Sequence, residues 1–174
     1  MIDIVLTNRK TAWVIAVCMI ISGLFLGTYT TFYQMRRQVV RQFRVEAEPV
    51  LNEMIQMTYN MLTIYLLNAP DDEDNTAWML ENIEQQSRRI AYLEFDAGTN
   101  EVMYNIALRL TELSEPLELS ESDARFMRNF LIDIDELNMV LRQTDYNTSA
   151  AEFNTVIRQG LGFLVPFIRP VPVF

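Results

Sequence analysis

The sequence predicts an all-α membrane protein, in which one N-terminal transmembrane helix is followed by an antiparallel bundle of four helices. An uncharged run covers residues 11–33 and is long enough to cross a bilayer. Beyond it, apolar residues recur at the spacings of three and four that are typical of helices. No segment alternates apolar and polar residues between glycine or Asn-Gly turns, so no β-strand is expected.

The uncharged run, TAWVIAVCMIISGLFLGTYTTFY, follows a short N-terminal tail of residues 1–10. As a helix it would be about 35 Å long, which exceeds a hydrocarbon core of about 30 Å. Trp13 near one end and Tyr29 and Tyr33 near the other place aromatic rings at both interfaces. We therefore expect a single-pass protein of the cell membrane, with the lipid bilayer as one partner.

Two alternatives to a permanent anchor apply to this segment. A cleaved signal peptide also begins with a basic tail, but this run is longer than a usual signal core and no A-x-A-like cleavage site follows it. A buried core helix would carry a polar stripe, whereas residues 12–27 are apolar on all faces. An anchor explains the segment better than either alternative.

Gly23 and Gly27 form a G-x-x-x-G pair inside the predicted span. This spacing lets two membrane helices approach closely, although glycine is frequent in membrane helices for other reasons. The pair is therefore a candidate helix–helix contact of a homo-oligomer. The orientation of the span follows from its flanks, because four arginines follow it while only Arg9, Lys10 and the amino terminus precede it. This slight excess favours a cytoplasmic location for the domain beyond the span.

The acidic helical bundle is predicted over residues 34–160. Helical spacing continues without a turn signal to about Asn68, so the membrane helix is expected to run into the bundle. Pro49 lies inside this helix and removes a backbone hydrogen bond. Either the helix bends at Pro49, or a new helix begins with Pro49 in its first turn.

The sequence NAPDDEDN breaks the chain before a second helix, TAWMLENIEQQSRRIAYLEF. Asp74 or Asn75 is placed to cap it, and its first turn favours negative charge. The alternative is a calcium-binding loop starting at Asp71. Such a loop would need glycine at Thr76 and glutamate at Asn82, so a solvated helix start fits better.

Asp96, Gly98 and Asn100 mark the next turn, and a third helix is predicted over residues 102–113. After an interruption that contains Pro116, Ser120 or Ser122 can cap the last helix, which we expect to run without a break to Gln159. Its apolar stripe consists of Met127, Phe130, Ile134, Leu137, Leu141, Tyr146, Ala150, Phe153 and Ile157.

Residues 161–174 form an apolar C-terminal tail with prolines at positions 166, 170 and 172. Prolines at this density prevent a helix but permit an extended chain. The tail can pack on the bundle, touch the membrane surface or bind a partner.

The composition excludes several function classes. Beyond residue 33 there are 22 acidic and 12 basic side chains, because only Asp3, Arg9 and Lys10 precede it, and the whole chain stands at −9. Such a surface is a poor match for nucleic acid. Histidine is absent, which removes the commonest general base and zinc ligand. Cys18 is the single cysteine and cannot build a metal site alone. We expect no cofactor and no metal.

Tyr146-Asn147 and Phe153-Asn154 repeat an aromatic-asparagine pair seven residues apart. On a helix this spacing places both aromatic rings on one face and both amides on an adjacent face. The amides can fix helix register through buried hydrogen bonds, or they can face solvent.

This stretch resembles the C-terminal signature of LemA-family proteins, where a tyrosine-asparagine pair precedes an aromatic-asparagine-threonine triplet and a hydrophobic-arginine ending like Ile157-Arg158. The resemblance is specific from Asp133 to Arg158, and the order of span, helical domain and tail is also similar. The part between the span and Pro49 is shorter than in that family, which makes the chain a divergent member. The resemblance implies a bacterial membrane-anchored bundle whose molecular activity is undefined, and it implies no catalytic residue.

Three functions follow from these observations. The first is a non-enzymatic, membrane-anchored protein that binds or regulates another membrane or envelope component. The second is structural self-assembly through the span and the long helices. The third is an enzyme that uses carboxylates or magnesium at Asp133, Asp135, Glu136 and the acidic loop NAPDDEDN, although consecutive acids on a helix more often form a solvated face.

Overall fold

The computed structural model describes residues 9–69, 71–93, 98–159 and 168–174, and every regular element in these ranges is helical. The prediction of an all-α chain with one long apolar N-terminal helix is confirmed. The elements in chain order are α2 (Arg9–Gln42), the π-helical segment η1 (Phe43–Ala47), α3 (Glu48–Asn68), α4 (Glu73–Ala91), α5 (Thr99–Ser114), α6 (Glu121–Arg142) and α7 (Asp145–Gln159).

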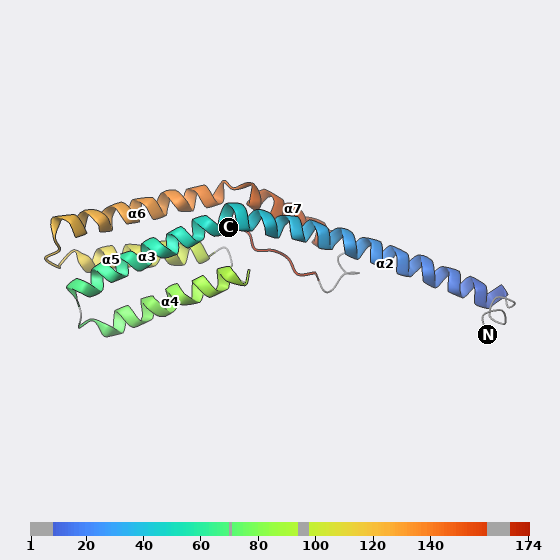
Figure 1. Ribbon diagram of the computed structural model, residues 1–174, viewed down its shortest axis with the longest axis horizontal. Coiled ribbons are helices and arrows are strands. Elements are labelled where there is room, and N and C mark those ends of the chain that lie inside the picture. The colour runs from blue at the N-terminus through green and yellow to red at the C-terminus, as the bar shows by residue number, and fades with distance from the viewer. Residues whose placement is uncertain (1–8, 70, 94–97, 160–167) are drawn as a thin grey trace.

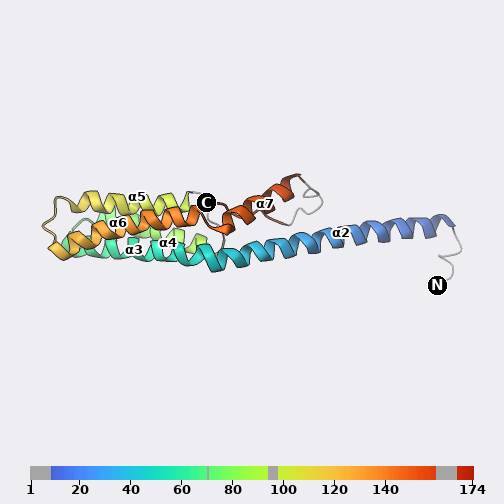
Figure 2. The same ribbon diagram turned by 90° about the horizontal axis from the view of Figure 1, so that it is seen from above.

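Helices α3, α4, α5 and α6 lie side by side at one end of the molecule, and the chain turns back after α3, α4 and α5 (Figures 1 and 2). Helix α3 is central, because it contacts α4, α5 and α6. Helix α2 projects from this group as a rod, with α7 in contact with its base. We call α3–α6 the helical domain.

Helix α2, η1 and α3 form one uninterrupted helical run, so no structural boundary separates residues 33 and 34. The irregularity expected at Pro49 lies just before it, in η1, and Pro49 is the second residue of α3. Pro49 is thus in a first turn, as the second alternative expected, but the helical run does not stop before it. In η1 the N–H of Glu48 donates to the carbonyl of Phe43, five residues back. The wider π turn accommodates the missing N–H and the ring of Pro49 without ending the helix.

Helix α4 differs from the prediction at both ends. Asp72 is its N-cap rather than Asp74 or Asn75, and the helix starts three residues before Thr76. The Asp72 carboxylate accepts hydrogen bonds from the Tyr65 hydroxyl at 2.6 Å and from the Asn75 amide at 3.0 Å, so it ties the end of α3 to the start of α4. Sequence alone did not reveal this tertiary partner. Helix α4 ends at Ala91 because Leu93 takes the left-handed conformation at φ 55°. The predicted end at Phe95 lies outside the described residues.

The last predicted helix is two helices, which corrects the expectation of a continuous helix to Gln159. Helix α6 begins where predicted, since the Ser120 hydroxyl accepts from the N–H of Asp123 at 3.1 Å. The break falls between Arg142 and Asp145. There the carbonyl of Leu141 accepts from the Thr144 hydroxyl at 2.8 Å and from the Asn147 amide at 2.8 Å, which closes α6 with side-chain donors.

The core lies where α3 meets its neighbours and continues along the base of α2 to α7. It is made of apolar side chains that are buried almost completely, and threonine or serine hydroxyls within it bond to carbonyls of their own helices. The largest of these apolar side chains are Phe43, Leu51, Met54, Met61, Leu62, Met79, Ile90, Met103, Ile106, Leu110, Tyr146 and Phe153.

Candidate functional site

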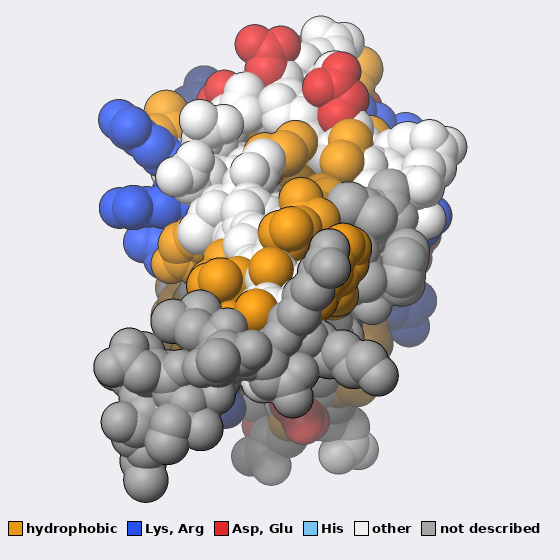
Figure 3. Space-filling view, turned by 90° about the vertical axis from the view of Figure 1, so that its right-hand side faces the viewer, with side chains coloured by type: hydrophobic (Ala, Val, Ile, Leu, Met, Phe, Trp, Pro, Cys, Tyr) orange, Lys and Arg blue, Asp and Glu red, His pale blue; other side chains and the backbone are white. Residues whose placement is uncertain are grey.

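The first functional feature is the uncharged part of α2, residues 11–33, which we call the apolar rod. Among the described residues, the helical run Thr11–Asn68 contains the one stretch that is long and apolar enough to cross a membrane, and none of that stretch is buried. Leu24 and Leu26, for example, are each 66% exposed. In the view along α2 from its N-terminal end, apolar side chains gather in the middle of the face and basic side chains lie toward its margin (Figure 3). A core helix of a water-soluble protein would be mostly buried, and this stretch is not.

Gly23 and Gly27 lie on an open face of this rod. A Cβ atom added to either glycine would meet nothing within 4 Å. The two glycines and four neighbours line a shallow hollow of about 390 Å³. The Thr28 hydroxyl donates to the carbonyl of Leu24 at 2.7 Å, and the Thr31 hydroxyl donates to the carbonyl of Gly27 at 2.9 Å. Both hydroxyls therefore have a hydrogen-bond partner within α2.

The second feature is the contact between α7 and the C-terminal residues 168–174. The Asn154 amide donates to the carbonyl of Val171 at 2.7 Å, and its oxygen accepts from the N–H of Val171 at 2.9 Å. The Asn147 amide oxygen accepts from the N–H of Phe174 at 2.9 Å. The Tyr146 hydroxyl donates to the carbonyl of Pro172 at 2.6 Å. We call Tyr146, Asn147 and Asn154 the α7 cradle.

The spacing of the two asparagines matches the spacing of the residues that they hold. Asn147 and Asn154 are seven residues apart, or about 10.5 Å along a helix. Val171 and Phe174 are three residues apart, or about 10 Å in an extended chain. Because Asn154 holds Val171 and Asn147 holds Phe174, the tail runs opposite to α7. The seven-residue spacing of the asparagines therefore matches the three-residue spacing of an extended chain that binds beside α7. The asparagines neither fix the register between helices nor face solvent, which were the two predicted roles.

Aromatic side chains from η1 and from the tail pack against the Tyr146 ring of the α7 cradle. The Tyr146 ring meets Phe43 edge-on, with the centroids 5.3 Å apart, and meets Phe174 at 5.9 Å. Val171 is buried beside them. Burial raises the pKa of the Tyr146 phenol above its usual range, while the nearby Arg36 guanidinium acts in the opposite direction. The hydroxyl therefore stays protonated and remains a donor at all ordinary pH values.

Glu46 of η1 fixes the start of α7. Its carboxylate accepts from the backbone N–H of Tyr146 at 3.0 Å, across 100 positions of sequence. The first N–H groups of a helix have no partner inside the helix and attract negative charge. Glu46 thus acts as a remote cap, and it places the cradle beside the π turn.

The sequence pattern indicated Tyr146, Asn147, Phe153 and Asn154, but it did not indicate the contacts of this stretch with η1 and the tail. Phe153 lies in the core, Ile157 is half-buried at its edge, and Arg158 is exposed. A signal for the tail was present, because prolines at 170 and 172 leave Val171 with an N–H between two residues that lack one. Residues 168–174 pack on α7, the first of the three predicted alternatives, while residues 161–167 lie outside the described part.

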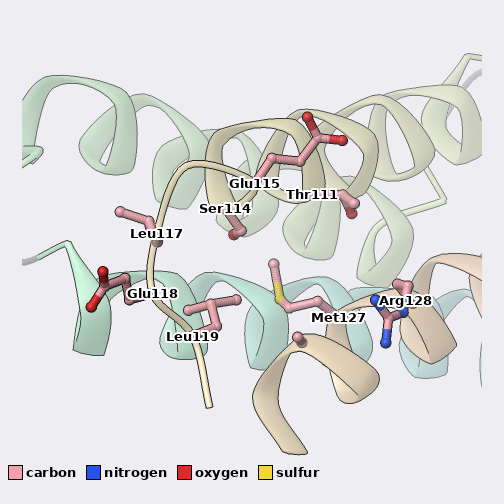
Figure 4. A pocket seen from close by; sticks show the side chains of 9 residues that line it. Thr111, Ser114, Glu115, Leu117, Glu118, Leu119, Met127 and Arg128 are labelled. Atoms are coloured by element: carbon pink, nitrogen blue, oxygen red, sulfur yellow. The ribbon is translucent and has the colours of Figure 1, made fainter. Parts of the chain in front are cut away.

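The acidic residues of α6 do not converge. Asp135 and Glu136 are exposed and Asp133 is half-buried. Within the described ranges, no group of three or more His, Cys, Asp or Glu side chains is arranged to hold a metal ion. A cavity of about 360 Å³ lies between the end of α5 and the start of α6. Its Glu115, Glu118 and Arg128 side chains point in different directions (Figure 4), so they form no common polar site.

No family model, curated protein or solved structure matched this chain when each was compared with it.

Proposed function

We propose that this chain is a membrane-anchored, non-enzymatic helical-bundle protein of the LemA type, which binds or regulates another membrane or envelope component of a bacterial cell. The observation that carries the proposal is the unburied apolar stretch of α2, joined without a break to the central helix of the helical domain. Such a stretch is costly in water and stable in lipid. The resemblance over residues 133–158 supports the family assignment and an antiparallel four-helix arrangement of α3–α6.

The surface that we assign to the partner is the groove between α3 and α4. It has a volume of about 500 Å³ and includes Tyr59, which is 47% exposed, and Arg88. Tyrosine and arginine are the residue types that carry most binding energy in protein interfaces. The tail was the other candidate surface for a partner, but its residues 168–174 are already bound by the α7 cradle. We therefore assign the partner to the groove. Its full lining is Ile55, Gln56, Tyr59, Ile83, Glu84, Ser87 and Arg88.

Alkaline extraction of membranes tests the anchor. We expect the full chain to stay in the pellet at its full mass, because α2 is embedded. The double variant Ile20→Arg/Leu24→Arg should be released, since an arginine at the centre of a span costs about 2.5 to 3.5 kcal/mol. A chain shortened by about 30 residues would indicate a cleaved signal peptide, and release of the unaltered chain would also contradict the anchor.

Photo-crosslinking tests the partner surface. A photoreactive residue at position 59 should give one discrete adduct in native membranes, and Arg88→Glu should remove it. The matched control is the same residue at position 132, which is exposed on α6 away from the groove. Equal adducts at both positions, or none at position 59, would contradict the assignment.

Self-assembly is the second candidate function, and the open face at Gly23 and Gly27 favours it. Glycines at this spacing allow close backbone approach between two spans. Cross-linking in native membranes should then give a ladder of homo-oligomers that Gly23→Leu/Gly27→Leu abolishes. A strictly monomeric band would contradict this candidate.

We place the helical domain in the cytoplasm, because arginines are more numerous after the span than basic groups before it. Protease added to intact and to permeabilised cells tests this orientation. Digestion only after permeabilisation is expected, and digestion in intact cells would reverse the assignment.

A further inference from the structure

Positive charge is concentrated at one level of the long helix. No acidic residue occurs between Lys10 and Glu46, and this interval contains Arg36, Arg37, Arg41 and Arg44. All four arginines follow the apolar rod directly. The rest of the chain after Glu46 is strongly acidic, so the charge of the molecule is segregated along its length.

Three of these arginines share one exposed face. Arg37, Arg41 and Arg44 are spaced by four and three residues, and together with Gln34, Gln38 and Val40 they line a hollow of about 600 Å³. We call Arg37, Arg41 and Arg44 the arginine face. Arg36 lies apart from this face, where its charge acts on Tyr146 under α7. Among the described residues, no carboxylate forms an ion pair with any member of the arginine face.

The height of these arginines above the apolar rod suits a lipid headgroup layer. They follow Tyr33 by four, eight and eleven residues, which places their Cα atoms about 6, 12 and 16 Å beyond it along the helix. The headgroup region adds about 5 to 8 Å to each side of the hydrocarbon core. Arg37 therefore lies inside it, and Arg41 can reach back with its long side chain. Arg44 lies within about one Debye length of the surface.

Acidic residues lie at the opposite end. The α3–α4 and α5–α6 connections are both at the end of the helical domain farthest from α2 (Figure 1). Asn68 at the end of α3 is about 50 Å beyond Tyr33 along the helical run. Residues 69–72 and 115–120 contain no lysine or arginine. Acidic side chains in or next to these connections are Asp71, Asp72, Glu115, Glu118, Glu121 and Asp123.

We propose that the arginine face binds the phosphate headgroups of anionic phospholipids in the leaflet from which the helical domain emerges. The phosphates neutralise three arginines that have no carboxylate partner among the described residues. The same negative surface repels the acidic far end when the helix tilts far enough to bring that end within about one Debye length of it. Both effects favour an upright helix, with the α3–α4 groove away from the bilayer. This inference rests on the proposed function, because it requires α2 to span the membrane.

Spin-labelled lipids test the proposal with the full chain in phosphatidylcholine bilayers. The quantity measured is the association of labelled phosphatidylglycerol with the protein relative to labelled phosphatidylcholine. A basic residue close to an anionic surface contributes about fivefold in affinity. We expect a preference of at least about fivefold at low salt, and a smaller one at 1 M salt, where the Debye length is only about 3 Å.

The variant Arg37→Gln/Arg41→Gln/Arg44→Gln should reduce the relative association to about one, because the arginine face supplies the charge. All three positions are exposed, so the fold should be unaffected. Replacement of the same three arginines by lysine should keep the preference. The matched control is Arg109→Gln/Arg125→Gln/Arg128→Gln, which removes the same charge near the end of α5 and the start of α6, far from the bilayer, and should leave the preference unchanged.

Flotation with pure phosphatidylcholine vesicles separates failure of this inference from failure of the proposed function. A chain that floats after an alkaline wash but shows equal association of the two lipids would overturn the arginine face alone. Equal loss in the Arg109→Gln/Arg125→Gln/Arg128→Gln control would also overturn it, because the preference would then reflect total charge. A chain that does not float would overturn both the inference and the anchor.

Discussion

Leu24 and Leu51 lie on the same uninterrupted helical run and have opposite environments. Leu24 is 66% exposed on α2, whereas Leu51 is fully buried on α3, the helix that contacts α4, α5 and α6. The two halves of the run are both rich in apolar residues. They differ in that the second half alternates apolar with polar residues, so a single stripe needs covering, while the first half is apolar all round. The chain supplies the partner of the second half, and for the first half we propose that the partner is lipid.

The largest expected effect comes from the same substitution, leucine to alanine, made at each of these two positions in turn. Leu51→Ala removes a side chain from a closed core and should lower the free energy of unfolding of the helical domain by about 2 to 5 kcal/mol. Leu24→Ala should change it by less than about 0.5 kcal/mol, because this side chain contacts no part of the domain. Denaturant titration of the full chain in a neutral detergent measures both. Similar losses at the two sites would show that the rod also packs on the domain.

A smaller effect is expected where the chain covers itself with an extended segment. Asn154→Ala leaves the N–H and the carbonyl of Val171 without their partner and should cost about 1 to 3 kcal/mol. Hydrogen exchange of residues 168–174 should accelerate, while exchange in α3 stays unchanged. Thr155→Ala on the outer side of α7 is the control, because its hydroxyl bonds only to its own helix at Ala151. Unchanged hydrogen exchange of residues 168–174 in Asn154→Ala would contradict the claim that the α7 cradle holds the tail.

The remote cap gives a third test. Glu46→Ala removes the acceptor for the N–H of Tyr146 and should cost about 1 kcal/mol, the usual value for a lost helix cap. Glu46→Gln keeps an acceptor and should recover part of this loss. Protection of the first amides of α7 reports the effect. Equal stability of the alanine variant and the unmodified chain would show that α7 does not depend on η1.

The smallest expected effect is a pH dependence at the far end of α3. The hydrogen bond from Tyr65 lowers the pKa of Asp72, and its acceptance by Asp72 raises the pKa of Tyr65 from 10.0 to about 12. The contribution of Asp72 is present above its unfolded pKa of about 3.9 and is lost as pH falls through its lower folded value. The contribution of Tyr65 is present below its unfolded pKa and is lost as pH rises through its folded value.

The stability difference between the unmodified chain and Tyr65→Phe should therefore be constant from about pH 5 to 9 and shrink on both sides. Denaturant midpoints across this range measure it. A difference that does not vary at either extreme would show that the Tyr65–Asp72 hydrogen bond is not formed in solution.

The helices themselves were predictable, because their signals are local. The apolar spacing on α4 and α5, and the cap at Ser120, depend on neighbours in sequence, and they placed α4, α5 and the start of α6 to within a few residues. The start of α4 was displaced since Asp72 is held by Tyr65, seven residues earlier on another helix. Local patterns do not contain that contact.

The break between α6 and α7 was not predictable from the sequence. No proline or glycine marks it, and the apolar stripe continues across it from Leu141 to Tyr146. The Thr144 and Asn147 side chains close α6 locally at the carbonyl of Leu141, and the Glu46 carboxylate caps α7 from a distant part of the chain. The α7 cradle was predictable only in part, because its partners also come from a distant part of the chain. The heptad repeat of asparagines indicated two amides on one face, but their partner is backbone of the tail, which has no side-chain signature beyond the spacing of its prolines.

The most direct test of the account uses Cys18, which lies in the apolar rod and is exposed in the isolated chain. A membrane-impermeant maleimide should fail to label Cys18 in native membranes and should label it once detergent and denaturant are added. The reference is a Cys18→Ser chain with Val45→Cys, an exposed position beyond the arginine face, which should be labelled in membranes opened on the side of the domain. Labelling of Cys18 in undisturbed membranes at the rate of the reference would contradict the claim that lipid covers the rod.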